Sequence, residues 1–220
     1  VALMSTAADM DNLAVVTRRH GPLTVTVLGT AGAKSNAIRT GVDAGAYIEG
    51  ADEDKKPAGT INIVLLSNIE LTDAALARAL ITVTEGKTAA LEDLHVPSTY
   101  TSTVQATGTG TDSIIAVSGT AAPRASYTGG HSRIGELIGK ATYQAVIEAL
   151  GKQNGFFLPG AKRFCNCRQD MRQMLTPARR QKLVHAQFDL QQVLVAGHLL
   201  QLLCRRGNVR AHHNETASIW

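Results

Sequence analysis

Three short segments of the chain carry the apolar patterns of β-strands. Leu23–Thr30 alternates apolar and polar side chains and reaches a glycine near its end. Ile61–Asn68 is almost continuously apolar until it ends in two polar residues, a pattern typical of a more buried strand. Ser113–Gly119 is the third apolar run. Because helical patterns follow the second and third runs, the chain is predicted to fold as an α/β protein.

Two longer segments carry apolar residues at helical spacing. The first begins after Thr72, a residue type that caps helix N-termini. Its apolar positions are Leu76, Leu80, Val83, Ala90 and Leu94. The second begins after the sequence TGGHS and stops near Gly151. Its apolar positions are Ile134, Leu137, Ile138, Ala141 and Ala145. The predicted fold is therefore a mixed sheet with long helices packed on it, and the Ser- and Thr-rich segment Ser98–Thr111 is predicted to be extended.

The distribution of charge divides the chain near residue 150. Residues 1–150 hold 11 Lys and Arg against 15 Asp and Glu, a net charge of −4. Residues 151–220 hold 11 against 3, a net charge of +8. Such a break indicates a boundary. We expect a single domain over residues 1–155, followed over residues 156–220 by a basic tail or a small helical appendage.

The overall composition is that of an ordinary globular protein. Apolar residues make up 44% and charged residues 18% of the 220 residues, and no run of 18 apolar residues is present. No signal-peptide pattern follows Val1, which suggests a truncated N-terminus and a cytoplasmic protein without a membrane partner. The basic tail contains no recognised nucleic-acid-binding module, so no nucleic-acid partner is expected. The sequence leaves the oligomeric state and the order of the strands open.

The run ATGTGTD, which leads into the third strand, is the first candidate for chemistry. Gly108 and Gly110 allow a ligand to approach the backbone closely, and Asp112 places a carboxylate beside them. Alternatively, Asp112 caps a turn and the threonines form an edge strand. Both interpretations remain open at the level of the sequence.

The start of the second helix is the next candidate. His131 and Ser132 stand where free amide groups favour negative charge, and a histidine there is suited to proton transfer near neutral pH. A histidine bonded to a backbone carbonyl is an equally good interpretation. Ser132 is expected to be the N-cap rather than a nucleophile. Glu136, one turn later, either orients His131 or is a solvated helix residue.

Lys87 is unexpected because its spacing places it in the apolar stripe of the first helix. A charge in such a position is paired or reaches a functional site, unless the lysine extends its ammonium group to solvent. The neighbouring Gly86 indicates close packing at this point, since glycine destabilises a helix interior.

Familiar cofactor and metal motifs are absent. The glycine run lacks a following Gly-Lys-Ser/Thr, and no GxGxxG follows the first strand. The histidines are scattered, and Cys165 and Cys167 form only a CxC pair. No metal and no cofactor are therefore expected.

Five blocks of sequence resemble the adenosylcobinamide amidohydrolase family of corrinoid salvage. In chain order the blocks are TAGAKSNA, GTINIVLLSN, LTDAALARALITVTEGKTAAL, STYTSTVQATGTGTD and GGHSRIGELIGKA. The resemblance covers roughly residues 4–155, and it suggests that an upstream strand-rich segment of the family domain is missing. The chain departs from the family pattern at Gly29, Lys34 and Gly86, and the resemblance ends at about Asn154. The remainder has the character of an appended or frameshifted tail, or of a small helical appendage.

The resemblance implies an enzyme that cleaves a linear amide bond. Members of the family cleave the amide between a propionyl side chain of the corrin ring and aminopropanol, giving adenosylcobyric acid. The corrinoid is thus the expected small-molecule substrate, and no separate cofactor is implied. The most recognisable motifs fall on Thr107–Asp112 and Gly130–Ser132. A corrinoid-binding module without catalysis is the alternative, and an unrelated interaction domain is a third hypothesis.

Amide hydrolysis requires a nucleophile, donors for the oxyanion and an acid for the departing amine. We predict Asp112 as the base that activates water, His131 as the acid and Glu136 as a supporting catalytic residue. A threonine nucleophile from the same run is a variant. Amides near Gly108, Gly110 and Gly130 are the expected oxyanion donors. The predicted substrate-binding residues are Asn36, Asn62, Asn68, Lys87, Thr107, Gly108, Thr109, Gly110, Thr111, Gly130 and Ser132.

Overall fold

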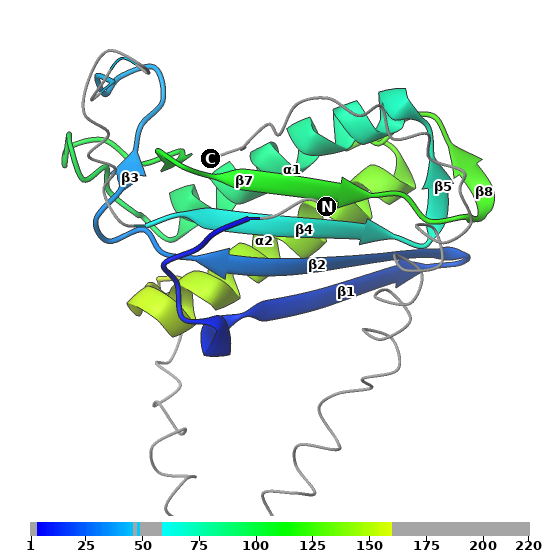
Figure 1. The fold of residues 1–220 in the computed structure, drawn as a ribbon, viewed down its shortest axis with the longest axis horizontal. Coiled ribbons are helices and arrows are strands. Elements are labelled where there is room, and N and C mark those ends of the chain that lie inside the picture. Colours follow the sequence, from blue (N-terminus) through cyan, green and yellow to red (C-terminus); the bar gives the residue numbers. More distant parts are fainter. Residues whose placement is uncertain (1–3, 46–47, 49–58, 160–220) are drawn as a thin grey trace, which may run out of the picture. The chain divides into compact units, whose positions relative to one another are not determined.

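The computed structural model describes residues 4–45, 48 and 59–159. Its main sheet has the strand order β1-β2-β4-β7 (Figure 1). These strands are Ala14–His20, Leu23–Ala31, Ile61–Ser67 and Ser113–Val117, respectively. Strand β2 is antiparallel to both β1 and β4, and β4 and β7 are parallel. The predicted mixed sheet is confirmed.

Two long helices pack on the same face of this sheet and against each other (Figure 1). Helix α1 spans Asp73–Asp93 and α2 spans Arg133–Asn154. The predicted N-cap is confirmed for α1, because the Thr72 hydroxyl accepts a hydrogen bond from the N–H of Ala75 at 3.2 Å. All five apolar positions predicted for α2 are buried. Leu80 of α1 is 41% exposed, so its predicted place in the buried stripe is wrong.

The helices approach closely at Gly86 and Gly139. A Cβ atom added to Gly86 would lie 2.9 Å from the carbonyl oxygen of Gly139, so a side chain at this point would separate the two helices. The close packing predicted from Gly86 is confirmed.

Short elements surround the two ends of the main sheet. A 3-10 helix, η1, spans Met10–Asn12. Strand β3 (Ala37–Ile38) pairs antiparallel with β6 (Gly108–Thr109), and β5 (Ile69–Leu71) pairs parallel with β8 (Ala121–Ala125). Within the segment predicted to be extended, only β6 and an isolated bridge at Gln105 are paired as strands, and Ser102 and Thr103 lie in a turn.

Three sequence predictions concern residues beyond the described ranges. The helical appendage falls almost wholly on residues 160–220, and the CxC pair lies in the same region. The nucleic-acid prediction for the basic tail also falls there.

Candidate active site

Asp112 lies at the amino-terminal end of β7 and accepts four hydrogen bonds. Its Oδ1 accepts from the N–H of Ile61 at 3.0 Å and from the hydroxyl of Thr109 at 2.5 Å. Its Oδ2 accepts from the N–H of Thr109 at 3.1 Å and from the ammonium group of Lys87. A carboxylate offers about four acceptor positions. Asp112 therefore closes the turn that begins at Thr109, as one interpretation of the sequence predicted, and it also neutralises a cation.

Lys87 reaches Asp112 from the buried face of α1. The residue is only 7% exposed, and the side chains of Lys87 and Asp112 are 9% and 13% exposed. A charge this deeply buried requires a partner, because burial without one is costly. Of the alternatives that the sequence left open for Lys87, the paired one is found, and its ammonium group does not extend to solvent. We refer to Thr109, Asp112 and Lys87 as the Thr–Asp–Lys cluster.

Gly108 allows the backbone to pass directly over this cluster. A Cβ atom at this position would lie 2.4 Å from Oδ2 of Asp112 and 2.6 Å from Nζ of Lys87. Any side chain would therefore displace at least one member of the ion pair. The close approach of backbone inferred from the glycine run is found, and the groups that approach are the protein's own carboxylate and ammonium.

The other residues of the run are held by neighbouring loops. The Thr111 hydroxyl donates to the carbonyl of Gly59 at 2.9 Å, and the Thr60 hydroxyl donates to the carbonyl of Thr111 at 2.7 Å. The Thr88 hydroxyl of α1 donates to the carbonyl of Thr107 at 3.2 Å. These bonds fix the run against both the sheet and α1.

Asn36 and Gly110 lie beside this run. Asn36 is 2% exposed, and its Nδ2 donates to the carbonyl of Gly59 at 2.9 Å. Its Oδ1 accepts from the Tyr100 hydroxyl at 3.2 Å and would lie 3.2 Å from a Cβ atom at Gly110. Asn36 thus braces the loop, with both ends of its side-chain amide engaged inside the protein.

The other two predicted asparagines lie at opposite ends of β4. Asn62, at the same end as Asp112, donates through Nδ2 to the carbonyl of Ser5 at 2.7 Å. Asn68 accepts from the N–H of Thr24 at 2.6 Å and donates to the carbonyl of Pro22 at 2.8 Å. Asn68 therefore holds the β1–β2 hairpin, and the fold separates it from the run that was predicted to bind substrate with it.

Ser132 is the N-cap of α2, as predicted. Its hydroxyl accepts from the N–H of Gly135 at 3.1 Å and donates to the carbonyl of Gly129 at 2.8 Å. His131 precedes it and is exposed, as is Gly130. Thr128 ties this loop to the first turn of α1, because its hydroxyl donates to the carbonyl of Ala75 at 2.6 Å.

Glu136 is engaged by two basic residues of its own helix. It pairs with Lys140 at 2.6 Å and with Arg133. The hydrogen bond from Lys140 lowers the pKa of the Glu136 carboxyl, and the charge of Arg133 adds to this effect. Glu136 is therefore a paired surface carboxylate, as one interpretation of the sequence held.

The predicted convergence of Asp112 with His131 is not found. At the end of the sheet that holds Asp112, Asn154 accepts from the N–H of Ala33 at 2.8 Å, so the carboxyl end of α2 lies there. A helix of 22 residues is about 33 Å long. His131 and Gly130, at the start of α2, accordingly lie toward the opposite end (Figure 1). Strand β7 carries the chain away from Asp112 before it reaches His131, and His131 is not among the four donors to Asp112. This corrects the assignment of His131 and Gly130 to one site with Asp112.

Sequence reasoning listed Thr109 and Lys87 as binding residues and allowed a threonine of the run as a variant nucleophile, but it did not connect Thr109 with Lys87. Two signals were present in the sequence. Thr109 stands three residues before Asp112, the spacing of a side chain that closes a turn, and Lys87 stands in an apolar stripe. Asp112 is the residue that contacts both Thr109 and Lys87.

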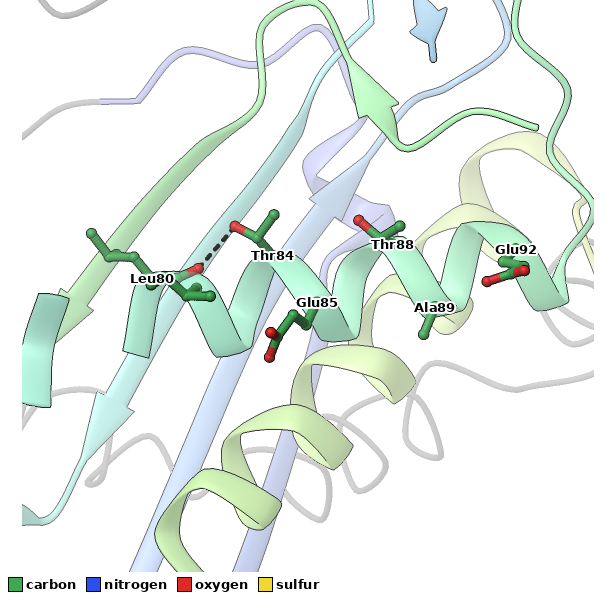
Figure 2. A pocket seen from close by; sticks show the side chains of 7 residues that line it. Leu80, Thr84, Glu85, Thr88, Ala89 and Glu92 are labelled. Atoms are coloured by element: carbon green, nitrogen blue, oxygen red, sulfur yellow. Dashed lines mark hydrogen bonds between the residues drawn. The ribbon is translucent and has the colours of Figure 1, made fainter. Parts of the chain in front are cut away.

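A shallow hollow lies on the outer surface of α1, next to the glycine run. It has a volume of about 530 Å³ and is lined by Leu80, Ile81, Thr84, Glu85, Thr88, Ala89 and Glu92. Figure 2 shows Thr84 and Thr88 on one side of the helix and Glu85 and Ala89 on the other. Leu80 and Ile81 are 41% and 53% exposed, so the surface here is partly apolar. Thr88 connects the hollow to the run through its bond to Thr107.

The model of the CbiZ family, described as adenosylcobinamide amidohydrolase, matches residues 1–157. The chain belongs to the adenosylcobinamide amidohydrolase family. The resemblance predicted from the five sequence blocks is confirmed. The Thr–Asp–Lys cluster lies entirely within the part of the chain that the family model covers.

One curated relative of this family member is an uncharacterized protein of Methanocaldococcus jannaschii. The two are 48% identical over 164 residues, which cover 70% of this chain and 64% of the relative. The chain thus spans less than two thirds of that relative's length. No solved structure matched the chain significantly.

Two further observations concern the described part of this amidohydrolase-family chain. None of the helices in residues 4–45 and 59–159 combines the length and the apolar character needed to cross a membrane. Over the same residues, no three His, Cys, Asp or Glu side chains are grouped so that they would hold a metal ion.

Proposed function

We propose that this chain hydrolyses the amide between aminopropanol and the corrin side chain of adenosylcobinamide, releasing adenosylcobyric acid. Membership of the adenosylcobinamide amidohydrolase family supports the reaction. The single structural observation that carries the proposal is the buried Asp112–Lys87 pair beneath Gly108, because it brings a base and an acid together two residues from the exposed Gly110.

Asp112 and Lys87 supply the two proton transfers that amide cleavage requires. Asp112 acts as the general base, as the sequence predicted. Lys87 takes the role of acid that the sequence assigned to His131, because its ammonium group contacts Asp112 directly. General acid–base assistance is typically worth about 10² to 10⁴ in rate. The backbone N–H of Gly108 remains a proposed donor for the oxyanion, whereas that of Gly110 donates to the carbonyl of Asn36 at 3.3 Å.

The hollow on α1 is the proposed binding surface for the corrin ring. A corrin ring is broad and partly apolar, which suits exposed Leu80 and Ile81. The bond between Thr88 and Thr107 makes this surface continuous with the glycine run. The scissile side chain would then extend from the hollow toward Gly108.

Incubation of the protein with adenosylcobinamide tests the proposal. We expect free aminopropanol and adenosylcobyric acid to appear in equal amounts, measured by chromatography coupled to mass spectrometry. Binding of the corrinoid without either product would support the non-catalytic module instead. Absence of both binding and products would overturn any corrinoid function for this chain.

We expect the His131→Ala variant to retain turnover within about threefold of wild type, since a substitution on the surface and away from the cluster has small effects. Initial rates of aminopropanol release measure this. A loss of a hundredfold or more would return His131 to the catalytic machinery and contradict the assignment of Lys87 as the acid.

A further inference from the structure

We infer that Thr109 is the nucleophile of the reaction and carries the corrinoid acyl group as an ester during turnover. The inference rests on the proposed function, and it concerns which oxygen atom attacks the amide. Thr109 is 7% exposed, and its Oγ1 lies 2.5 Å from Oδ1 of Asp112. A hydroxyl in contact with a carboxylate base is the arrangement that activates serine and threonine nucleophiles.

The hydrogen bonds that the Asp112 carboxylate already accepts favour the Thr109 hydroxyl over water as the nucleophile. Each of its oxygens accepts two hydrogen bonds, and a carboxylate has about four acceptor positions. A water molecule would first have to displace one of these donors. Two of the donors are backbone N–H groups and one is the ammonium group of Lys87. The Thr109 hydroxyl is the remaining donor, and its oxygen is the nucleophilic one.

The surroundings hold this oxygen in a fixed position. The Thr109 backbone N–H donates to the same carboxylate that its hydroxyl contacts. The residue lies in β6, where it pairs with Ala37 of β3. The N–H of Thr111 lies 3.4 Å from Oγ1 and is a candidate donor for the oxyanion that develops next to it.

The first half of the reaction forms the ester. Oγ1 bonds to the amide carbon while its proton moves to Oδ1 of Asp112. Collapse of the tetrahedral intermediate breaks the C–N bond, and Lys87 donates a proton to the nitrogen, so that neutral aminopropanol leaves. A proton then passes from Asp112 to Lys87, which restores the ion pair.

The second half consumes water. Asp112 takes a proton from a water molecule whose oxygen attacks the ester carbon. The C–O bond to Thr109 breaks, and Oγ1 recovers a proton from Asp112. The net reaction is amide plus water giving acid plus amine, with no other reactant.

Hydroxylamine provides a direct test, because an ester intermediate reacts with it to give the hydroxamate of adenosylcobyric acid. We expect wild-type protein, supplied with adenosylcobinamide and increasing hydroxylamine, to form hydroxamate in place of acid while aminopropanol release is not slowed. Mixtures without protein, and protein with free adenosylcobyric acid, are the controls. Aminopropanol release without any hydroxamate would overturn the inference and leave the proposed function standing. Wild-type protein that releases no aminopropanol would overturn the proposed function and the inference together.

Three threonine variants provide a second test. We expect Thr109→Val to lose at least about 10³-fold in turnover, since removing a nucleophile has effects of that size or greater. Thr109→Ser keeps a hydroxyl and is expected to retain both turnover and hydroxamate formation. Thr103→Val, at an exposed threonine that belongs neither to the predicted nor to the proposed site, is the matched control and is expected to remain active. A Thr109→Val variant that turns over within tenfold of wild type would overturn the inference.

Discussion

Asparagine in place of Asp112 is expected to destabilise the protein and to remove most of its turnover. The Asp112 side chain accepts all four of its hydrogen bonds from other groups. An asparagine has one acceptor oxygen and one NH₂ group, so in either orientation its NH₂ group faces two donors. Lys87 would also lose its counter-charge while remaining buried. We expect the free energy of unfolding to fall by about 3–5 kcal/mol, the usual cost of breaking a buried ion pair.

The same substitution removes the proposed base. We expect turnover of adenosylcobinamide to fall by about 10²- to 10⁴-fold. Urea unfolding measures the first effect, and initial rates of aminopropanol release, at a temperature where the variant is folded, measure the second.

Asp93→Asn is the matched control for this experiment. Asp93 is exposed and accepts a hydrogen bond from the Tyr143 hydroxyl at 2.6 Å, a bond that an asparagine oxygen also accepts. We expect the free energy of unfolding of this variant to change by less than about 1 kcal/mol. If Asp112→Asn behaved like Asp93→Asn in both measurements, the Thr–Asp–Lys cluster would be neither a structural nor a catalytic centre.

Local periodicity was sufficient to predict most of the regular elements. The apolar runs of β2, β4 and β7 and the helical spacing of α1 and α2 each lie within one segment of the chain. Strand β1 was missed because only Ala14 and Val16 of its seven residues are buried, so its apolar pattern is weak. The order of the strands follows from pairing between distant segments, which local periodicity does not encode.

The candidate site shows the same division between local and distant information. Asp112, Thr109 and Gly108 are close in sequence, and their grouping was predicted. Lys87 was recognised as anomalous, but its partner lies 25 residues further along the chain and was not predicted. The assignment of His131 failed because a family motif indicates which residues recur, whereas the distance between these two motifs depends on the path of β7, which lies between them in the chain.

Alanine in place of Gly108 is expected to damage the site more than the fold. Its Cβ atom would overlap Oδ2 of Asp112 and Nζ of Lys87. These two groups can move away only by breaking the hydrogen bond between them. We expect the free energy of unfolding to fall by about 1–3 kcal/mol, the usual cost of overpacking. A displacement of about 1 Å at reacting groups is enough to lower kcat/KM by about 10²-fold.

Gly130→Ala separates this steric effect from the general effect of replacing a glycine. Neither glycine has a positive φ, and a Cβ atom at Gly130 would have no neighbour within 4 Å. We therefore expect Gly130→Ala to match wild type in urea unfolding and in kcat/KM, while Gly108→Ala is impaired in both. Equal behaviour of the two variants would mean that the backbone does not need to approach Asp112 and Lys87 closely. Gly108 would then have no role in positioning Asp112 and Lys87.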